Sequence, residues 1–170
     1  MAFNLHSPLK NNVMKTYLFI ALSILSLTSL SAQSNALGVR LGGGDGAQAE
    51  ISYQQYIGGP NRLEFDLGFF DDGFADGFKF TLLYQWVNEI ESGFYWYVGA
   101  GGSIGQRDLH GHFSDDDDFD EGVFLNLDGQ LGIEYNFEIP IQLSLDVRPE
   151  FGIINDDFDM GYGLGIRYTF

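Results

Sequence analysis

The sequence predicts an all-β fold, and three observations support this prediction. Large apolar side chains alternate with small or polar ones in several segments, most clearly over the last eleven residues, Met160–Phe170. Alternation with a period of two places the two sets on opposite faces of a strand. After the N-terminal region, no segment shows a competing helical period. The chain also contains no cysteine, so a hydrogen-bonded sheet must stabilise it without disulfide bridges or cysteine metal sites.

The first 32 residues are predicted to be an N-terminal extension followed by a secretory signal peptide. Met14-Lys15 opens an apolar run over residues 17–30, and the small residue Ala32 follows shortly after it. A positive charge, an apolar core and a small residue before the cleavage point are typical of export signals. We expect cleavage after Ala32, which leaves residues 33–170 as one domain. Translation that starts at Met1 or at Met14 would supply the same signal.

The composition excludes one class of partner and one kind of membrane segment. Loss of Lys10 and Lys15 leaves six basic and 24 acidic residues in 33–170, a formal charge of −18. Nucleic acid is therefore not an expected partner, because phosphate binding requires basic surface. No stretch after the signal reaches the roughly 18 consecutive apolar residues of a spanning helix. Any passage through a membrane must consequently be made by strands.

Eight segments fit strands, and their lengths suit tilted strands that cross the hydrocarbon core of a bilayer. They lie near residues 36–42, 47–57, 62–70, 78–88, 94–106, 123–137, 141–154 and 160–170. Within the seventh segment, Pro149 cannot donate a ladder hydrogen bond, so we expect a local bulge or distortion there.

The connections between these segments alternate between two kinds. Short turns are predicted at 58–61, 89–93 and 138–140. The alternate connections, at 43–46, 71–77, 107–122 and 155–159, are richer in Asp and include the longest. Strict alternation of tight turns with loops is typical of an up-and-down barrel whose termini both lie on the periplasmic side. The predicted fold is an eight-stranded antiparallel up-and-down transmembrane β-barrel that presents its acidic loops to the outside.

With these features, residues 36–170 resemble the small eight-stranded outer-membrane β-barrels of Gram-negative bacteria, of the OmpX and OmpA transmembrane type. The terminal segment Ile166–Phe170 is similar to the C-terminal aromatic signal that the barrel-assembly machinery recognises. The segments Val98–Gly105 and Ile141–Pro149 also look like strands of such barrels. The resemblance implies an exported protein in outer-membrane lipid, with the assembly machinery as a partner during biogenesis. It implies no cofactor and no particular activity.

If the apolar faces point outward, charged residues fill the interior. The predicted lumen charge network consists of Arg40, Glu50, Glu64, Asp66, Lys79, Asp128, Glu134, Asp146, Arg148, Glu150 and Arg167, with Arg107 as a further candidate. An eight-stranded barrel has room for side chains but hardly for a water column. Opposite charges should therefore pair, because an unpaired buried charge is costly. Structural packing is favoured over a conducting path, and inward glycines would make room for Tyr95, Tyr97 and Arg148.

Aromatic residues are predicted to mark the two membrane interfaces. The periplasmic girdle would contain Trp86, Trp96, Tyr135, Phe137, Tyr168 and Phe170, and the opposite girdle Phe69, Phe80, Phe151 and Tyr162. Contact with the lipid interface is favoured over sugar stacking or a cofactor role.

The loop 107–122 holds the densest group of polar residues. Its carboxylates Asp115, Asp116, Asp117, Asp118, Asp120 and Glu121 are weak candidates for a divalent-cation site, because hard cations take several oxygen ligands. Counted from Asp116, Glu121 occupies the place where an EF-hand requires Gly. A solvated charge run is therefore favoured. His110, His112 and Ser114 suggest a hydrolase, but no motif fixes a nucleophile against a base, and catalysis is not expected.

Three functions follow for comparison. The favoured one is an integral outer-membrane barrel with a structural or interaction role, which displays acidic loops to an unidentified extracellular partner and catalyses no reaction. The alternative is a narrow channel for ions or small solutes. A secreted lipocalin-like barrel is disfavoured, because exchanging the two faces would expose Gly161, Gly163 and Gly165 to water and bury both tryptophans.

Overall fold

The computed structural model describes residues 35–43, 49–71, 75–109, 122–154 and 156–170. All of these lie within the predicted domain 33–170, whereas the predicted signal peptide and the loop residues 110–121 lie outside the described residues. Among the described residues, no helix is long and apolar enough to cross a membrane.

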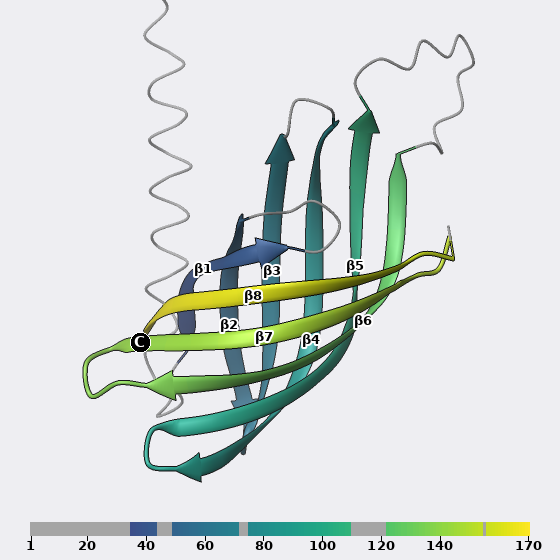
Figure 1. The fold of residues 1–170 in the computed structure, drawn as a ribbon. Helices are drawn as coiled ribbons and strands as arrows, with labels where there is room; N and C mark the ends of the chain where they lie inside the picture. Colours follow the sequence, from purple (N-terminus) through teal and green to yellow (C-terminus); the bar gives the residue numbers. More distant parts are fainter. Residues whose placement is uncertain (1–34, 44–48, 72–74, 110–121, 155) are drawn as a thin grey trace, which may run out of the picture. The chain divides into compact units, whose positions relative to one another are not determined.

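Eight strands form one closed antiparallel barrel (Figure 1). They are β1 (Ala36–Gly43), β2 (Ala49–Gly58), β3 (Asn61–Asp71), β4 (Ala75–Glu91), β5 (Phe94–Leu109), β6 (Val123–Asn136), β7 (Ile141–Gly152) and β8 (Phe158–Thr169). Each strand pairs with its neighbours in the chain, and β8 pairs with β1 to close the sheet. The predicted fold class, an all-β barrel of eight antiparallel strands in up-and-down order, is confirmed.

The strands β4 and β5 are longer than predicted, with 17 and 16 residues. Asp76, Gly77 and Asp108 were expected in loops because Asp and Gly are depleted in strands. In the structure, Asp76 pairs with Asp108 and Gly77 with Arg107, so the hairpin ladder continues through them. Cross-strand pairing therefore overrides the local preference of these residues.

The strands are strongly staggered around the barrel. Following paired residues from Leu37 through all strands in order leads to Phe158, at the start of β8. Leu37 itself, however, pairs with Tyr168 at the other end of β8. This offset reflects the tilt that closing a sheet into a barrel requires.

Pro149 interrupts a ladder without forming a bulge. The pairs Asp128–Glu150 and Leu131–Val147 share one register on either side of it. A Cβ added to Gly129 would lie 3.1 Å from Cγ of Pro149, so the proline ring covers this glycine. The predicted distortion is thus a gap in the β6–β7 ladder, whose register does not shift.

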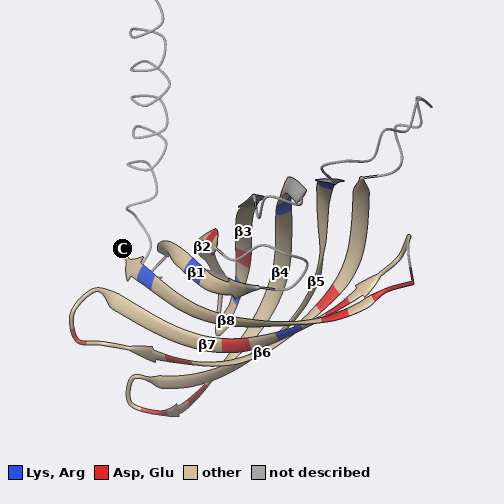
Figure 2. Ribbon diagram, turned by 45° about the horizontal axis from the view of Figure 1, so that its top comes forward, with Lys and Arg blue, Asp and Glu red and all other residues tan. Residues whose placement is uncertain are grey.

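The barrel is apolar outside and polar inside, the reverse of a soluble protein. Leu145, Leu164 and Ile166 are 55%, 44% and 41% exposed, whereas Asp146 and Arg167 are buried. The reading with exchanged faces, the lipocalin-like barrel, is therefore wrong. In Figure 2 the basic residues lie within strands, and acidic residues lie both in strands and at hairpin turns.

Candidate functional site: the charged lumen

Twelve charged side chains point into the barrel and are at most 4% exposed. We call them the lumen network: Arg40, Glu50, Arg62, Glu64, Asp66, Lys79, Asp128, Glu134, Asp146, Arg148, Glu150 and Arg167. The structure thus places all eleven residues of the predicted network inside the barrel, together with one more, Arg62. The strand alternation explains the placement, because the neighbouring residues in each strand are the apolar ones that face outward.

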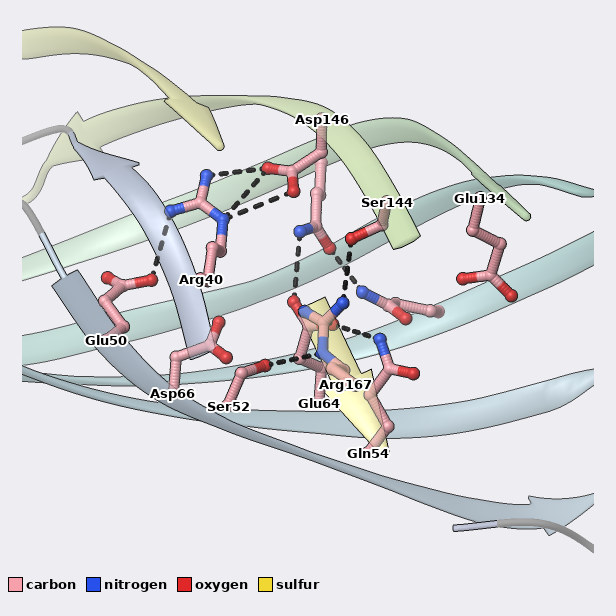
Figure 3. A network of polar contacts seen from close by, with 12 residues as sticks. Arg40, Glu50, Ser52, Gln54, Glu64, Asp66, Glu134, Ser144, Asp146 and Arg167 are labelled. Carbon is pink, nitrogen blue, oxygen red and sulfur yellow. Dashed lines mark hydrogen bonds and ion pairs between the residues drawn. The ribbon is translucent and has the colours of Figure 1, made fainter. Parts of the chain in front are cut away.

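Glu64 on β3 is the centre of the network (Figure 3). Its Oε1 accepts hydrogen bonds from Gln130 at 3.1 Å and from Arg148 at 3.2 Å. Its Oε2 accepts from Gln54 at 2.6 Å and from Arg167 at 3.0 Å. These four donors come from β6, β7, β2 and β8. One carboxylate therefore ties together five strands.

Arg148 and a further arginine, Arg40, connect the strands around Glu64. Arg148 donates to Asp66 at 2.6 Å and to Glu50 at 3.4 Å. Arg40 donates to the same Glu50 at 3.0 Å and, through Nε and Nη2, to Asp146 at 2.6–3.3 Å. The carboxylates of Glu50 and Glu64 are thus each shared by two arginines, with Arg148 common to both, which offsets the desolvation of all five groups.

Arg62, which the sequence reasoning omitted, forms the second cluster. It donates to both carboxylate oxygens of Glu134, at 2.9 and 2.6 Å, and its guanidinium lies 4.9 Å from the ring centroid of Tyr97. Arg62 also donates to Gln85, which donates to Gln130 and so joins this cluster to Glu64. The signal was available: Arg62 lies two and four residues before Glu64 and Asp66, on the same strand face.

One end of the barrel carries the loops that connect β3 to β4, β5 to β6 and β7 to β8. The lumen near this end contains the ion pair between Lys79 on β4 and Glu150 on β7. Asp128 is buried in the same region and pairs in register with Glu150. Arg107, the additional candidate, is half-buried near the end of β5. Nine neutral polar residues outside the charge network complete the lining: Ser52, Gln54, Thr81, Gln85, Ser103, Asn126, Gln130, Gln142 and Ser144.

Within the part of the chain that the structure describes, no three His, Cys, Asp or Glu residues could together hold a metal ion. His110, His112, Ser114 and the six candidate loop carboxylates lie outside the described residues. The lumen network fills the barrel and links its strands through ion pairs and hydrogen bonds.

The predicted aromatic residues lie on the outer wall. The six near the turn-side end are 39–54% exposed, and Tyr135 contacts Phe137 in an edge arrangement at 4.8 Å between ring centroids. At the opposite end of the barrel, Phe69, Phe80, Phe151 and Tyr162 are exposed as well. There the ring centroids of Phe151 and Phe158 lie 4.9 Å apart. Aromatic residues near both ends of an apolar wall are typical of membrane interfaces.

A closed barrel of eight strands with an apolar exterior and a filled polar interior defines the class of small transmembrane β-barrels. Comparison with solved structures confirms this resemblance at the level of the fold. The N-terminal β-barrel domain of OprF from Pseudomonas aeruginosa is 15% identical with a TM-score of 0.60, and the match covers 81% of this chain and 96% of that domain.

Two further solved structures share the fold, each over 81% of this chain. Neisserial surface protein A (NspA) is 14% identical with a TM-score of 0.57 and 94% coverage of its chain. Ail of Yersinia pestis, the attachment invasion locus protein, is 13% identical with a TM-score of 0.52 and 97% coverage. No protein-family model matches the chain, and no curated protein matches it.

Proposed function

We propose that the protein is an integral outer-membrane barrel with a structural or interaction role, which displays acidic loops at the cell surface and catalyses no reaction. The observation that carries this proposal is the outer wall. Its strands expose large apolar residues such as Leu127, Leu131 and Leu145, each more than 50% exposed, on every side of a closed sheet. Contiguous apolar surface of this extent requires lipid around it.

The acidic character of the loops results from the uneven distribution of basic and acidic residues between the lumen and the rest of the chain. Five of the six basic residues of 33–170 are in the lumen network, whereas 17 of the 24 acidic residues are not. The connections between strands are accordingly acidic and suit a cationic or cation-bridged partner. Export by the predicted signal peptide and insertion by the barrel-assembly machinery belong to the same proposal.

Membrane extraction combined with heat-modifiability tests the barrel in the outer membrane. We expect the protein to fractionate with outer membranes, to require detergent for extraction, and to migrate differently on gels before and after heating. Protease added to whole cells should cut loops such as 107–122 and spare the turns around residues 92 and 139. A protein that is soluble without detergent would contradict the proposal.

The channel alternative is disfavoured by the ion pairs that cross the lumen. Arg62 and Glu134 join β3 to β6, and Lys79 and Glu150 join β4 to β7, so charged side chains occupy the path of any permeant. We expect recordings in planar bilayers to show no steady, selective conductance. Such a conductance, lost on heating the protein, would favour the channel.

A further inference from the structure

The seam between β1 and β8 differs from the other seven strand pairs, because no hairpin connection joins its two strands. Turn type and loop length help to set register within hairpins, but they cannot act here. Apolar alternation excludes a slip of one residue, which would exchange the two faces. It does not exclude a slip of two residues, which leaves every side chain on its own face. Another feature must therefore select the register of the seam.

The inward positions of the two strands carry a complementary pattern of arginine and glycine. In the observed register, Arg40 of β1 lies opposite Gly165 of β8, and Arg167 of β8 lies opposite Gly38 of β1. Both glycines allow a close approach: a Cβ on Gly38 would lie 2.6 Å from Cα of Arg167. Each strand thus supplies one arginine and faces the partner's arginine with a glycine.

Arg40 reaches across β8 to the strand beyond it. A Cβ on Gly163 would lie 2.3–2.5 Å from the guanidinium of Arg40, so this group lies directly over Gly163. On the far side, Gly163 pairs with Asp146 of β7, which accepts the hydrogen bonds from Arg40. Figure 3 shows Arg40 between Asp146 and Glu50, which lies on β2.

Arg167 makes the reverse crossing. It passes β1 at Gly38, whose partner on β2 is Ser52, and donates to the Ser52 hydroxyl at 3.0 Å. It also donates to Ser144 of β7 at 2.8 Å and to Glu64 of β3. The two arginines therefore cross the seam in opposite directions and bind the strands on both sides of it.

Both two-residue slips would bring like charges together. In one direction, Arg40 would lie directly opposite Arg167. In the other direction, the crossing point of Arg40 would move from Gly163 to Gly161, whose partner on β7 is Arg148 rather than Asp146. Like charges in a buried site are strongly unfavourable. In the native register, each arginine faces a glycine and reaches acceptors on the strand beyond it.

We propose that Arg40 and Arg167, with Gly38, Gly163 and Gly165, form a closure latch that selects the register of the β1–β8 seam and so completes the barrel. The latch is a property of the fold and is independent of any partner at the cell surface.

Cysteine cross-linking in this cysteine-free chain tests the latch. Val39 and Ile166 face outward and are paired in the native register, so V39C/I166C reports correct closure. The pairs V39C/L164C and V39C/Y168C report the two slipped registers. The full chain is refolded into phosphatidylcholine vesicles and oxidised with copper phenanthroline. With both arginines present, only the native pair should cross-link efficiently.

Replacing the two arginines by methionine, R40M/R167M, should lower the ratio of native to slipped cross-links about tenfold. This ratio change corresponds to a loss of about 1.4 kcal/mol in the free-energy difference between the registers. The control R62M removes an equally buried, ion-paired arginine away from the seam and should leave the ratio unchanged. An unchanged ratio in R40M/R167M would overturn the latch.

A second measurement covers the case in which R40M/R167M forms no barrel. In the reference sample, the V39C/I166C disulfide is formed in the folded protein that keeps both arginines, and the cross-linked chain is then unfolded. In the second sample, the same disulfide is formed in denaturant in a chain that also carries R40M/R167M. Refolding of both cross-linked chains is followed by the heat-dependent gel shift. Recovery of folding by the disulfide supports a role at the seam, and failure of a cross-linked R40M/R167M chain to fold contradicts it.

Discussion

Glu64 on the inner wall and Leu145 on the outer wall show how differently the two faces of one sheet are specified. Glu64 accepts hydrogen bonds from four side chains on four other strands, and each donor has a defined position. Leu145 is 55% exposed and needs only an apolar environment. The inner wall therefore depends on the identity of each residue, whereas the outer wall depends on polarity and depth in the membrane.

The largest effect is expected for Glu64→Gln. This change removes the negative charge between Arg148 and Arg167 and leaves both guanidinium groups with less compensation, at a cost of about 3–5 kcal/mol in the free energy of unfolding. Urea unfolding from vesicles, followed by tryptophan fluorescence, measures it. The exposed Glu89→Gln is the matched control and should stay within about 0.5 kcal/mol. Equal losses of stability in Glu64→Gln and Glu89→Gln would show that the inner wall does not depend on the identity of Glu64.

On the outer wall, Leu145→Arg should cost about 2–4 kcal/mol, because this position lies in the middle of the apolar band. Ile139→Arg, in the turn between β6 and β7, should cost only about 0–1 kcal/mol. The same unfolding measurement in vesicles compares the two variants. Equal losses of unfolding free energy in Leu145→Arg and Ile139→Arg would show that the outer wall does not contact hydrocarbon.

A double-mutant cycle on Arg62 and Glu134 sharpens the comparison within the lumen. Each single change to methionine leaves one buried charge without its bidentate partner, whereas R62M/E134M removes both charges. The double variant should therefore be more stable than the sum of the single effects predicts, by about 0.5–3 kcal/mol. Additive effects would mean that the two side chains do not act as a pair.

Apart from the control variants, the smallest effect is expected for Tyr135→Leu, in the aromatic girdle that contains Trp86 and Trp96. The change keeps the surface apolar and removes an edge contact with Phe137. Such a contact is worth about 0.5–1.5 kcal/mol. Unfolding from vesicles measures this loss, and Leu131→Ile on the same strand serves as the control. A loss as large as that from Glu64→Gln would contradict the distinction between the walls.

Most of the fold could be predicted from the sequence, because strand alternation and turn residues act over short distances. The ends of β4 and β5 could not, since Asp76 and Asp108 favour loops on their own and become strand residues only by pairing with each other. The inward direction of the charged residues was predictable from alternation as well. Arg62 was missed although its position relative to Glu64 placed it on the same face.

The sequence by itself determined the number of strands, the order of turns and loops, and which face of each strand is apolar, because all of these follow from neighbouring residues. Only the tertiary structure decided which charges pair. Arg62 and Glu134 are 72 residues apart, and Arg40 and Asp146 are 106 apart. Such partners meet through the stagger of all eight strands and the register at which β1 and β8 close, and no local pattern contains either quantity.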